Sequence, residues 1–272
     1  MKESPSQSQP KTVDMDNVNH VIVIMSGKGG VGKSTVAGNL AVSFARATEG
    51  NVGILDADLH GPDIPKILGV EDQILSGSEE VIKPGYSQNM KVMSMGLALP
   101  DKDSPVVWRG PMKMKAIRQF LEDVDWGPLE YLIIDLPPGT GDEPLSISQL
   151  IEEIHGAIIV TTPQDVALLD SRKAVNFAKK LEMPVMGILE NMSGFVCPHC
   201  GEKTDIFKEG GGEKAAGDLN VPFLGKIPLD HKVVRTGDLG VPFVERYPEE
   251  SAGKAFARVV ENCRAFLHSK DN

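Results

Sequence analysis

The chain has 272 residues, of which 41% are hydrophobic and 24% are charged, and its formal net charge is −10 at pH 7. This length and composition suffice for one large buried core or two modest ones, and they indicate a globular, enzyme-sized protein. The acidic balance argues against a protein held on DNA or on anionic lipid mainly by electrostatics, so we expect no nucleic acid and no membrane among its partners.

The beginning of the chain carries no targeting pattern. No apolar run approaches the roughly 20 residues of a membrane-spanning helix. The opening stretch MKESPSQSQPKTVDMD has neither an apolar signal core nor the Arg-rich character of a transit peptide, so we expect a cytoplasmic protein. Its Ser, Gln and Pro content predicts a disordered tail over residues 1–16, followed by a single domain over residues 17–272.

Short β-branched apolar runs alternate with longer helical patterns through the rest of the chain. The runs predict strands at 20–25, 51–55, 90–95, 131–135, 156–162, 185–190 and 221–227. The helical patterns predict helices at 33–48, 112–124, 144–154, 165–182 and 252–268. This rhythm is typical of an α/β fold with a doubly wound, mostly parallel sheet and helices on both faces. The segment 194–217 breaks the rhythm, and we expect it to leave the sheet as a loop.

A glycine-rich loop follows the first predicted strand. The stretch SGKGGVGKST fits the phosphate-binding pattern G-x-x-x-x-G-K-[ST], and it stands between a strand and a helix as that pattern requires. Its glycines let backbone N–H groups point at phosphate oxygens, and the following helix adds its positive end. We expect Lys33 to neutralise the β and γ phosphates and Ser34 to bind Mg²⁺. The ATP-binding residues predicted in this loop are Gly27, Lys28, Gly29, Gly30, Val31, Gly32, Lys33, Ser34 and Thr35.

Lys28 gives this loop the form K-G-G-x-G-K-[ST]. The form closely resembles the deviant Walker A class of P-loop ATPases, which includes MinD, ParA-like ATPases and the nitrogenase iron protein. The resemblance implies a homodimer in which Lys28 reaches the nucleotide of the other subunit and stabilises the charge that develops on the transferred phosphoryl group. The alternative is an ordinary lysine that faces solvent.

Acidic residues stand at the ends of two predicted strands. In ILDADLHGPDIP, the resemblance implies that Asp58 orients the attacking water and that Asp56 helps to hold the metal. In YLIIDLPPGTGD, Asp135 ends an apolar strand as a Walker B acid would. A carboxylate at a strand end can instead cap a helix or a turn. The expected catalytic residues are Lys28, Lys33 and Asp58, and the expected Mg²⁺ ligands are Ser34, Asp56 and Asp135.

The same resemblance implies where the base of the nucleotide binds. Asn191 in ENMSG and the loop TTPQD, with Thr162, Pro163 and Gln164, would face the adenine. The stretch from Ile227 to Asp230 would close the far side. An asparagine amide can hydrogen-bond both a ring nitrogen and the exocyclic amine of adenine, which favours ATP over GTP.

Longer stretches narrow the resemblance to one branch of the class. Together they look like the Mrp (ApbC-like) ATPases over about residues 19 to 265, and they are DLHGPDIPKILG, WRGPMKMKAIRQFLEDVDWGPLEYLIIDLPPGTGD, TTPQDVALLDSRKAVNFAKK, NMSGFVCPHCG, GGGEKAA and VPFLGKIPLD. Members of that family carry iron-sulfur clusters and transfer them to apo-proteins, binding and hydrolysing ATP. The resemblance therefore implies a slow ATPase that acts as a switch for cluster transfer, with cluster donors and apo-proteins as partners.

Two of the three cysteines, Cys197 and Cys200, form the CxxC of FVCPHCGEK. One cluster or one tetrahedral zinc ion needs about four thiolates. A two-fold dimer axis would bring two CxxC motifs together, so we expect a 4Fe-4S cluster that bridges two subunits. A structural zinc at the same site and a thioredoxin-like redox pair are the alternatives. Cys263 has apolar neighbours in a helical pattern and is predicted to be buried, and no cysteine precedes Cys197, so we expect no N-terminal cluster.

Two other functions are compatible with a deviant Walker A loop. A spatial organiser like MinD or ParA would need a basic patch or an amphipathic tail, and organisers lack the CxxC. A nitrogenase-like reductase would draw its cysteines from widely separated loops. The acidic charge and the close cysteine pair favour the cluster carrier.

Overall fold

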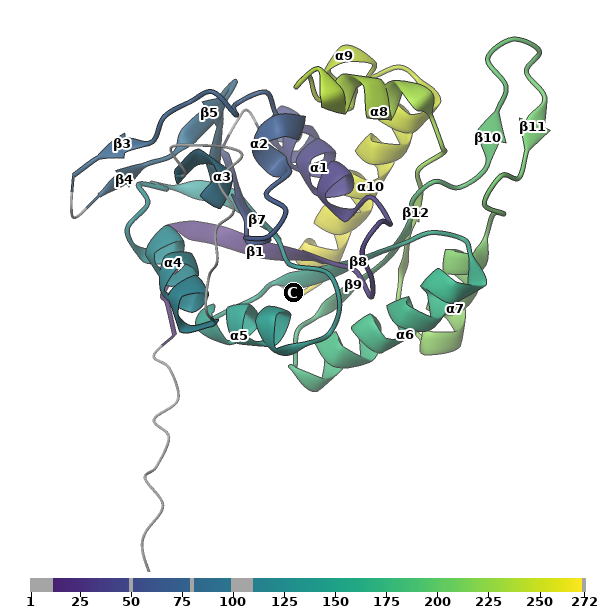
Figure 1. Ribbon diagram of the computed structural model, residues 1–272. Coiled ribbons are helices and arrows are strands. Elements are labelled where there is room, and N and C mark those ends of the chain that lie inside the picture. Colours follow the sequence, from purple (N-terminus) through teal and green to yellow (C-terminus); the bar gives the residue numbers. More distant parts are fainter. Residues whose placement is uncertain (1–11, 49–50, 79–80, 99–109, 271–272) are drawn as a thin grey trace, which may run out of the picture.

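The computed structural model describes residues 12–48, 51–78, 81–98 and 110–270. Its centre is an eight-stranded sheet with the order β12-β9-β8-β1-β7-β2-β6-β5 (Figure 1). The strands are β1 (Val18–Met25), β2 (Val52–Asp56), β5 (Gly85–Ser87), β6 (Met90–Ser94), β7 (Leu129–Asp135), β8 (Gly156–Thr161), β9 (Val185–Glu190) and β12 (Phe223–Lys226). All pairs in this sheet are parallel except β5 with β6. The predicted fold class is confirmed, and the seven predicted strands are the parallel ones.

Helices cover both faces of the sheet. The longer ones are α1 (Lys33–Ala47), α4 (Gly110–Glu122), α5 (Asp142–Leu150), α6 (Asp165–Lys180), α7 (Gly211–Leu219), α8 (His231–Asp238) and α10 (Ser251–His268). Single turns form α2 (Ile64–Ile67), α3 (Met95–Ala98) and α9 (Phe243–Arg246). Helices α1 and α10 lie on one side of the sheet, and α4 to α7 lie on the other (Figure 1). No helix within the described ranges is long and apolar enough to cross a membrane.

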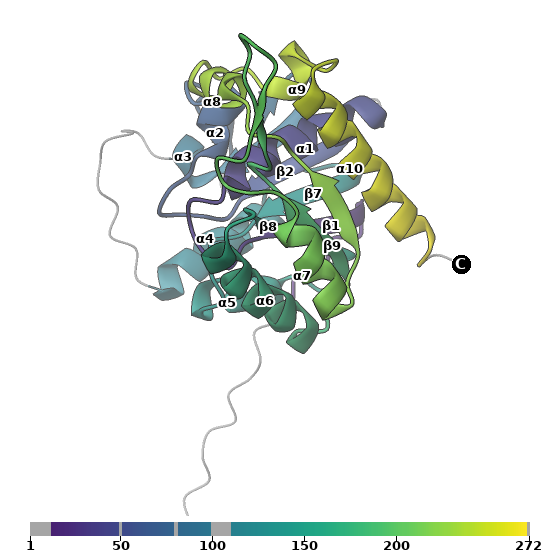
Figure 2. The same cartoon turned by 90° about the vertical axis from the view of Figure 1, so that its right-hand side faces the viewer.

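Two small two-stranded sheets stand apart from the main one. Strands β3 (Ser76–Gly77) and β4 (Ile82–Lys83) form the first, and β10 (Phe195–Val196) and β11 (Lys203–Thr204) form the second. The β10–β11 hairpin projects from the body of the molecule and carries the CxxC at its tip (Figures 1 and 2).

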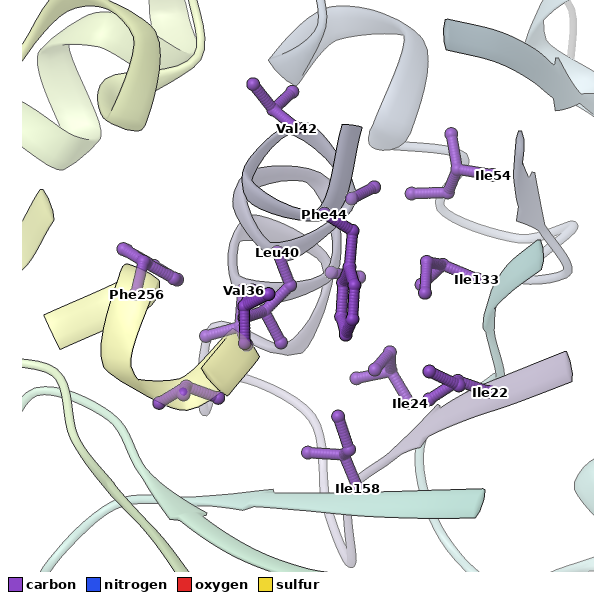
Figure 3. Close-up of a cluster of buried hydrophobic side chains, with 14 of the residues drawn as sticks. Ile22, Ile24, Val36, Leu40, Val42, Phe44, Ile54, Ile133, Ile158 and Phe256 are labelled. Atoms are coloured by element: carbon purple, nitrogen blue, oxygen red, sulfur yellow. The ribbon is translucent and has the colours of Figure 1, made fainter. Parts of the chain in front are cut away.

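The core consists of two apolar clusters, one on each face of the sheet. Side chains alternate along β1, so Ile22 and Ile24 pack in the cluster that contains α1 and α10, whereas Val21 and Val23 pack in the cluster that contains α4 to α7. Figure 3 shows Phe44 of α1 among the isoleucines of the strands. A parallel sheet buried on both faces needs continuous apolar strands, which explains why these strands were predictable.

The first described residues lie before the predicted end of the tail at residue 16. Val13 is 3% exposed, its N–H donates to the Leu150 carbonyl, and its carbonyl accepts from the Glu152 N–H. The ordered part therefore begins before the predicted boundary at Asn17, because one apolar side chain and two backbone hydrogen bonds hold Val13 beside Ile151. Residues 1–11 of the predicted tail lie outside the described residues.

The predicted loop excursion over 194–217 is also shorter in the structure. Residues 211–219 form helix α7, whose Ala215 and Ala216 are buried against the sheet. Within residues 194–217, the part that leaves the body of the molecule is the hairpin before α7.

Phe44 offers a direct test of the α1 side of the core. Its side chain is fully buried, and its ring lies 4.7 Å from the Tyr131 ring. We expect Phe44→Ala to lower the free energy of unfolding by about 3–5 kcal/mol, because it removes the ring and leaves a cavity. The control Ile74→Ala, at a side chain 91% exposed, should change it by less than about 0.5 kcal/mol. Denaturant unfolding measures both, and equal effects would contradict this description of the core.

Candidate nucleotide, metal and cysteine sites

The strand order places the predicted nucleotide residues at one edge of the sheet. Strands β1, β7 and β2 are neighbours, and in their parallel register Ile24 lies beside Asp135 and Asp135 beside Asp56. The carboxyl ends of the three strands therefore meet at the same edge. The glycine-rich loop leaves β1 there, so residues more than a hundred positions apart come together.

The loop has the backbone that its glycines allow. Gly30 and Gly32 have φ angles of 80° and 78°, in the left-handed region that favours glycine. Gly32 is the N-cap of α1 and makes no side-chain capping hydrogen bond, and the first turn of α1 contains no acidic residue. The positive end of α1 is therefore not neutralised by the helix itself, as a phosphate site requires.

Lys33 and Asp135 form a buried ion pair in this edge. The Lys33 ammonium lies 2.6 Å from Asp135 Oδ1, and the two side chains are 6% and 0% exposed. Lys33 Nζ also lies 3.4 Å from Ser34 Oγ. Within the described residues, the buried Asp135 Oδ2 has no hydrogen-bond partner. The structure thus brings Lys33, Ser34 and Asp135 together, and it leaves one carboxylate oxygen for a further ligand.

Asp56 organises the loop that follows β2. Its Oδ1 accepts a hydrogen bond from the Asp58 N–H at 3.1 Å. Its Oδ2 accepts from the Ile64 N–H at 3.2 Å and from the Ser94 hydroxyl at 3.1 Å. Both oxygens of this fully buried carboxylate therefore hold protein groups. Its predicted part in the metal site remains a prediction.

The electrostatics of the centre favour a divalent cation. Burial raises the pKa of Asp56 well above its ordinary value, and the neighbouring Asp135 raises it further, while Lys33 lowers it. Burial likewise raises the pKa of Asp135 against the opposing effect of Lys33. Two buried carboxyl groups thus face one ammonium. Carboxylate and hydroxyl oxygens are the ligands that Mg²⁺ prefers, so the oxygens of Asp135 and Ser34 fit that ion.

The other two predicted catalytic residues border this centre. Asp58 is half-buried, and its Oδ1 accepts hydrogen bonds from the N–H groups of His60 and Gly61 at 3.2 and 3.4 Å. Lys28 is half-buried, and the Ser26 hydroxyl donates to its carbonyl at 2.9 Å. In the part of the chain that the structure describes, the Lys28 side chain forms no ion pair. No acidic side chain among the described residues therefore holds its ammonium.

A pocket of about 280 Å³ opens beside the glycine-rich loop. Its wall includes Asn191, whose side-chain nitrogen donates to the Val31 carbonyl at 2.9 Å, and the stretch 227–230. Both were predicted to surround the base. Pro163 is not among the residues that line this pocket, and its carbonyl instead lies against Gly211. The base contacts of Asn191 and Pro163 remain predictions.

Sequence reasoning missed several residues of these sites. The pocket is also lined by Asp63, which precedes α2, by Lys66 within α2, and by residues of α8, a helix that the periodicity did not indicate. Lys113 of α4 lies 2.7 Å from His60 Nε2 and 3.0 Å from Glu143 Oε1. It thereby ties the loop after β2 to the first turn of α5. No local signal reveals this contact, since its partners are 53 and 30 residues away.

The two cysteines of the hairpin lie in one tight turn. The Cys197 N–H donates to the Glu202 carbonyl at 2.9 Å, and the Gly201 N–H donates to the Cys197 carbonyl at 2.8 Å. The backbone N–H groups of Cys200 and His199 and the Cys200 thiol lower the pKa of Cys197, which favours its thiolate. Burial raises the pKa of Cys263 to about 12, so that thiol is unsuited to bind metal.

The hairpin supplies only part of a metal site. Among the described residues, no group of three or more His, Cys, Asp or Glu side chains is placed to hold a metal ion. To hold a metal ion, the two thiolates of one copy of the chain would therefore need further ligands.

The sheet order, the glycine-rich loop and the paired acids define a P-loop NTPase. A family model described as NUBPL iron-transfer P-loop NTPase matches residues 17–264, and the chain belongs to that family. This membership confirms the resemblance that the motifs indicated.

Individual relatives agree with the family. The chain is 53% identical to the iron-sulfur cluster carrier protein of Methanocaldococcus jannaschii over 253 residues, which are 93% of this chain and 82% of that protein. Among solved structures, the nucleotide-binding protein of Archaeoglobus fulgidus in complex with ADP is 42% identical, with a TM-score of 0.72 over 83% of this chain and 88% of that one. The cell division ATPase MinD of Pyrococcus furiosus is 25% identical, with a TM-score of 0.69 over 91% and 99%.

The raised pKa values of Asp56 and Asp135 predict how acidification affects Mg²⁺ binding. A raised folded-state pKa means that the nucleotide-free protein gains stability as pH falls through that value, and loses it as pH rises. The same protons compete with Mg²⁺, so we expect the affinity for Mg²⁺-ADP to fall on acidification above the ordinary Asp value of 3.8. Calorimetric titrations between about pH 8 and 5 measure this effect.

The variant Asp56→Asn is compared with the wild type, because the titration of the nucleotide itself contributes equally to both proteins. It should show the weaker pH dependence. Identical pH profiles for the variant and the wild type would contradict a buried acid pair that competes for protons.

Proposed function

We propose that this protein binds and slowly hydrolyses ATP, and that two copies of it hold an iron-sulfur cluster and deliver it to apo-proteins. The observation that carries the proposal is one chain with both a P-loop nucleotide centre and a projecting hairpin of two cysteines. The likeness to proteins named iron-sulfur cluster carriers supports the choice of cargo.

The nucleotide centre positions ATP rather than reacting with it. The backbone of the loop and the positive end of α1 bind the phosphates, and Lys33 moves its charge from Asp135 toward the β and γ phosphates. Mg²⁺ would neutralise part of the phosphate charge when it is bound. Ser34 and Asp135 would hold it, and Asp56 would keep the neighbouring loop in place. Asp58 then orients the water whose oxygen bonds to the γ phosphorus as the bond to ADP breaks.

A symmetric homodimer would give Lys28 a partner and would supply the further thiolates that the CxxC lacks. The Lys28 ammonium has no ion-pair partner in its own chain as described, and a second copy would let it reach the opposite nucleotide. The CxxC gives two thiolates, and a second copy would raise the number to the four that a 4Fe-4S cluster takes.

Transfer of the cluster is an exchange of ligands. Thiolates of the apo-protein replace those of Cys197 and Cys200 on iron, and no electron needs to move. A cluster held by two ligands from each subunit, at the end of a projecting hairpin, is accessible to such attack. The half-exposed position of Cys197 and the exposed position of Cys200 support this role.

Removing the hairpin thiols tests the cargo. After anaerobic reconstitution, we expect about four irons per dimer and a broad thiolate-to-iron absorption band. Cys197→Ala and Cys200→Ala should each abolish most of both, because each removes two of the four ligands of the dimer. Cys263→Ala, at a buried thiol, should keep both. Zinc in place of iron, or iron retained in the hairpin variants, would contradict the proposed cargo or its ligands.

Lys28 tests hydrolysis in trans. We expect Lys28→Ala to reduce ATP hydrolysis roughly tenfold or more while ADP affinity stays close to the wild type, since the lysine acts on the partner's transition state. Lys254→Ala removes a side chain that is 66% exposed and serves as the control. Mixing Lys28→Ala with a Lys33→Ala protein that cannot bind ATP gives a second check. If Lys28 acts in its own subunit, the mixture stays inactive. If Lys28 acts in trans, Lys28 of the Lys33→Ala subunit acts on the ATP bound to the Lys28→Ala subunit and restores activity.

A further inference from the structure

Glu190 is a buried carboxylate that the nucleotide centre does not use. It ends β9, and its side chain is 0% exposed. Its Oε1 accepts a hydrogen bond from the Gly210 N–H at 2.9 Å and another from the Ser193 hydroxyl. Its Oε2 accepts from the Gly212 N–H. A charge so deeply buried is stable only when its oxygens are satisfied in this way.

These contacts close the base of the cysteine hairpin. Ser193 stands just before the hairpin in the chain, and Gly210 stands just after it, so one carboxylate holds both ends. Gly210 and Gly212 also begin helix α7, which has no side-chain cap of its own. Glu190 therefore caps α7 from a neighbouring strand, where the positive end of the helix favours an anion.

The glycines of GGGEKAA explain why this cap is tight. A Cβ atom on Gly212 would lie 3.0 Å from Glu190 Cβ and 3.1 Å from Oε2. Gly217, on the same helix, would place its Cβ in open space. The close approach of α7 to Glu190 is thus specific to the first turn of that helix.

The next residue in the chain contacts the nucleotide loop. The Asn191 amide donates to the Val31 carbonyl, and a Cβ on Gly32 would lie 2.4 Å from its nitrogen. The Asn191 N–H also donates to the Thr161 carbonyl at 2.7 Å, which extends the pairing of β9 with β8 by one residue. Two consecutive side chains therefore contact the phosphate loop and the hairpin base, with no flexible residue between them.

We propose that Glu190 is a positioning residue that couples the nucleotide site to the metal affinity of Cys197 and Cys200. The inference rests on the proposed function and names the residue through which the nucleotide acts. A shift of the phosphate loop when ATP binds moves Asn191. Glu190 moves with it and reorients the hairpin through Ser193 and Gly210. The reorientation changes how well the two thiolates can share a metal with those of a second copy.

Cobalt binding to the metal-free full-length protein tests the coupling. Co²⁺ gives a thiolate-to-metal absorption band, and its affinity is measured with and without a non-hydrolysable ATP analogue and Mg²⁺. We expect the analogue to change the Co²⁺ affinity of the wild type by about fivefold or more, and Co²⁺ to change the analogue affinity by the same factor. In Glu190→Gln an amide NH₂ replaces one acceptor oxygen and faces an N–H or hydroxyl donor. The factor should then fall to less than about twofold, while each ligand alone still binds.

Two matched controls separate coupling from general damage. Glu213→Gln makes the same change on α7 at a carboxylate that is 59% exposed, and it should keep the wild-type factor. Gly212→Ala pushes the cap apart without altering charge and should lose the factor, whereas Gly217→Ala should keep it. If Glu190→Gln does not fold, the two glycine variants decide the question.

The inference is overturned if Glu190→Gln or Gly212→Ala keeps the wild-type factor, if the controls lose it equally, or if the wild type shows none. A wild type without any thiolate band would overturn both this inference and the proposed function. A normal band with an unchanged factor in Glu190→Gln would overturn the inference alone.

Discussion

The buried pair of Lys33 and Asp135 is the constraint around which the nucleotide centre is built. An ammonium taken out of water without a partner is costly, so Lys33 can occupy this position only where a carboxylate meets it. The parallel register of β1 and β7 provides that carboxylate at the point where the glycine-rich loop begins. The parallel register of β2 and β7 places Asp56 beside Asp135. Two carboxyl groups then lie near one lysine, and this excess of acidic groups favours a divalent cation.

Much of this arrangement could be predicted from the sequence, because its signals are local. Strands buried on both faces read as apolar runs, and the phosphate loop has a fixed spacing. The features that were missed depend on partners distant in the chain. Helix α7 begins with glycines and relies on Glu190 for its cap, and the Lys113 contacts join three separate segments. Val13 is an isolated apolar residue with polar neighbours on both sides, so no pattern distinguished it from the predicted tail.

The cysteine hairpin and the nucleotide centre differ in their exposure to solvent. The charged side chains Lys33, Asp56 and Asp135 of the centre are buried, and preorganised charges act most strongly on a phosphate where water is excluded. The hairpin is a two-stranded ribbon held mainly at its base, with a tip that is open to other molecules. The turn around Cys197 lowers the pKa of its thiol, which favours the thiolate, and it leaves Cys200 exposed. One chain therefore carries a buried nucleotide centre and, separate from it, an accessible pair of cysteines.

The two edges of the main sheet restrict how copies of the chain can associate. At one edge, β5 has three residues and is antiparallel to β6. At the other, β12 pairs with β9 through an irregular register and ends at Lys226, which binds Glu209 and Glu213. Short, irregular and charged edges oppose the addition of another strand. Continuous sheets across two molecules, and the open-ended polymers that such pairing produces, are thereby disfavoured.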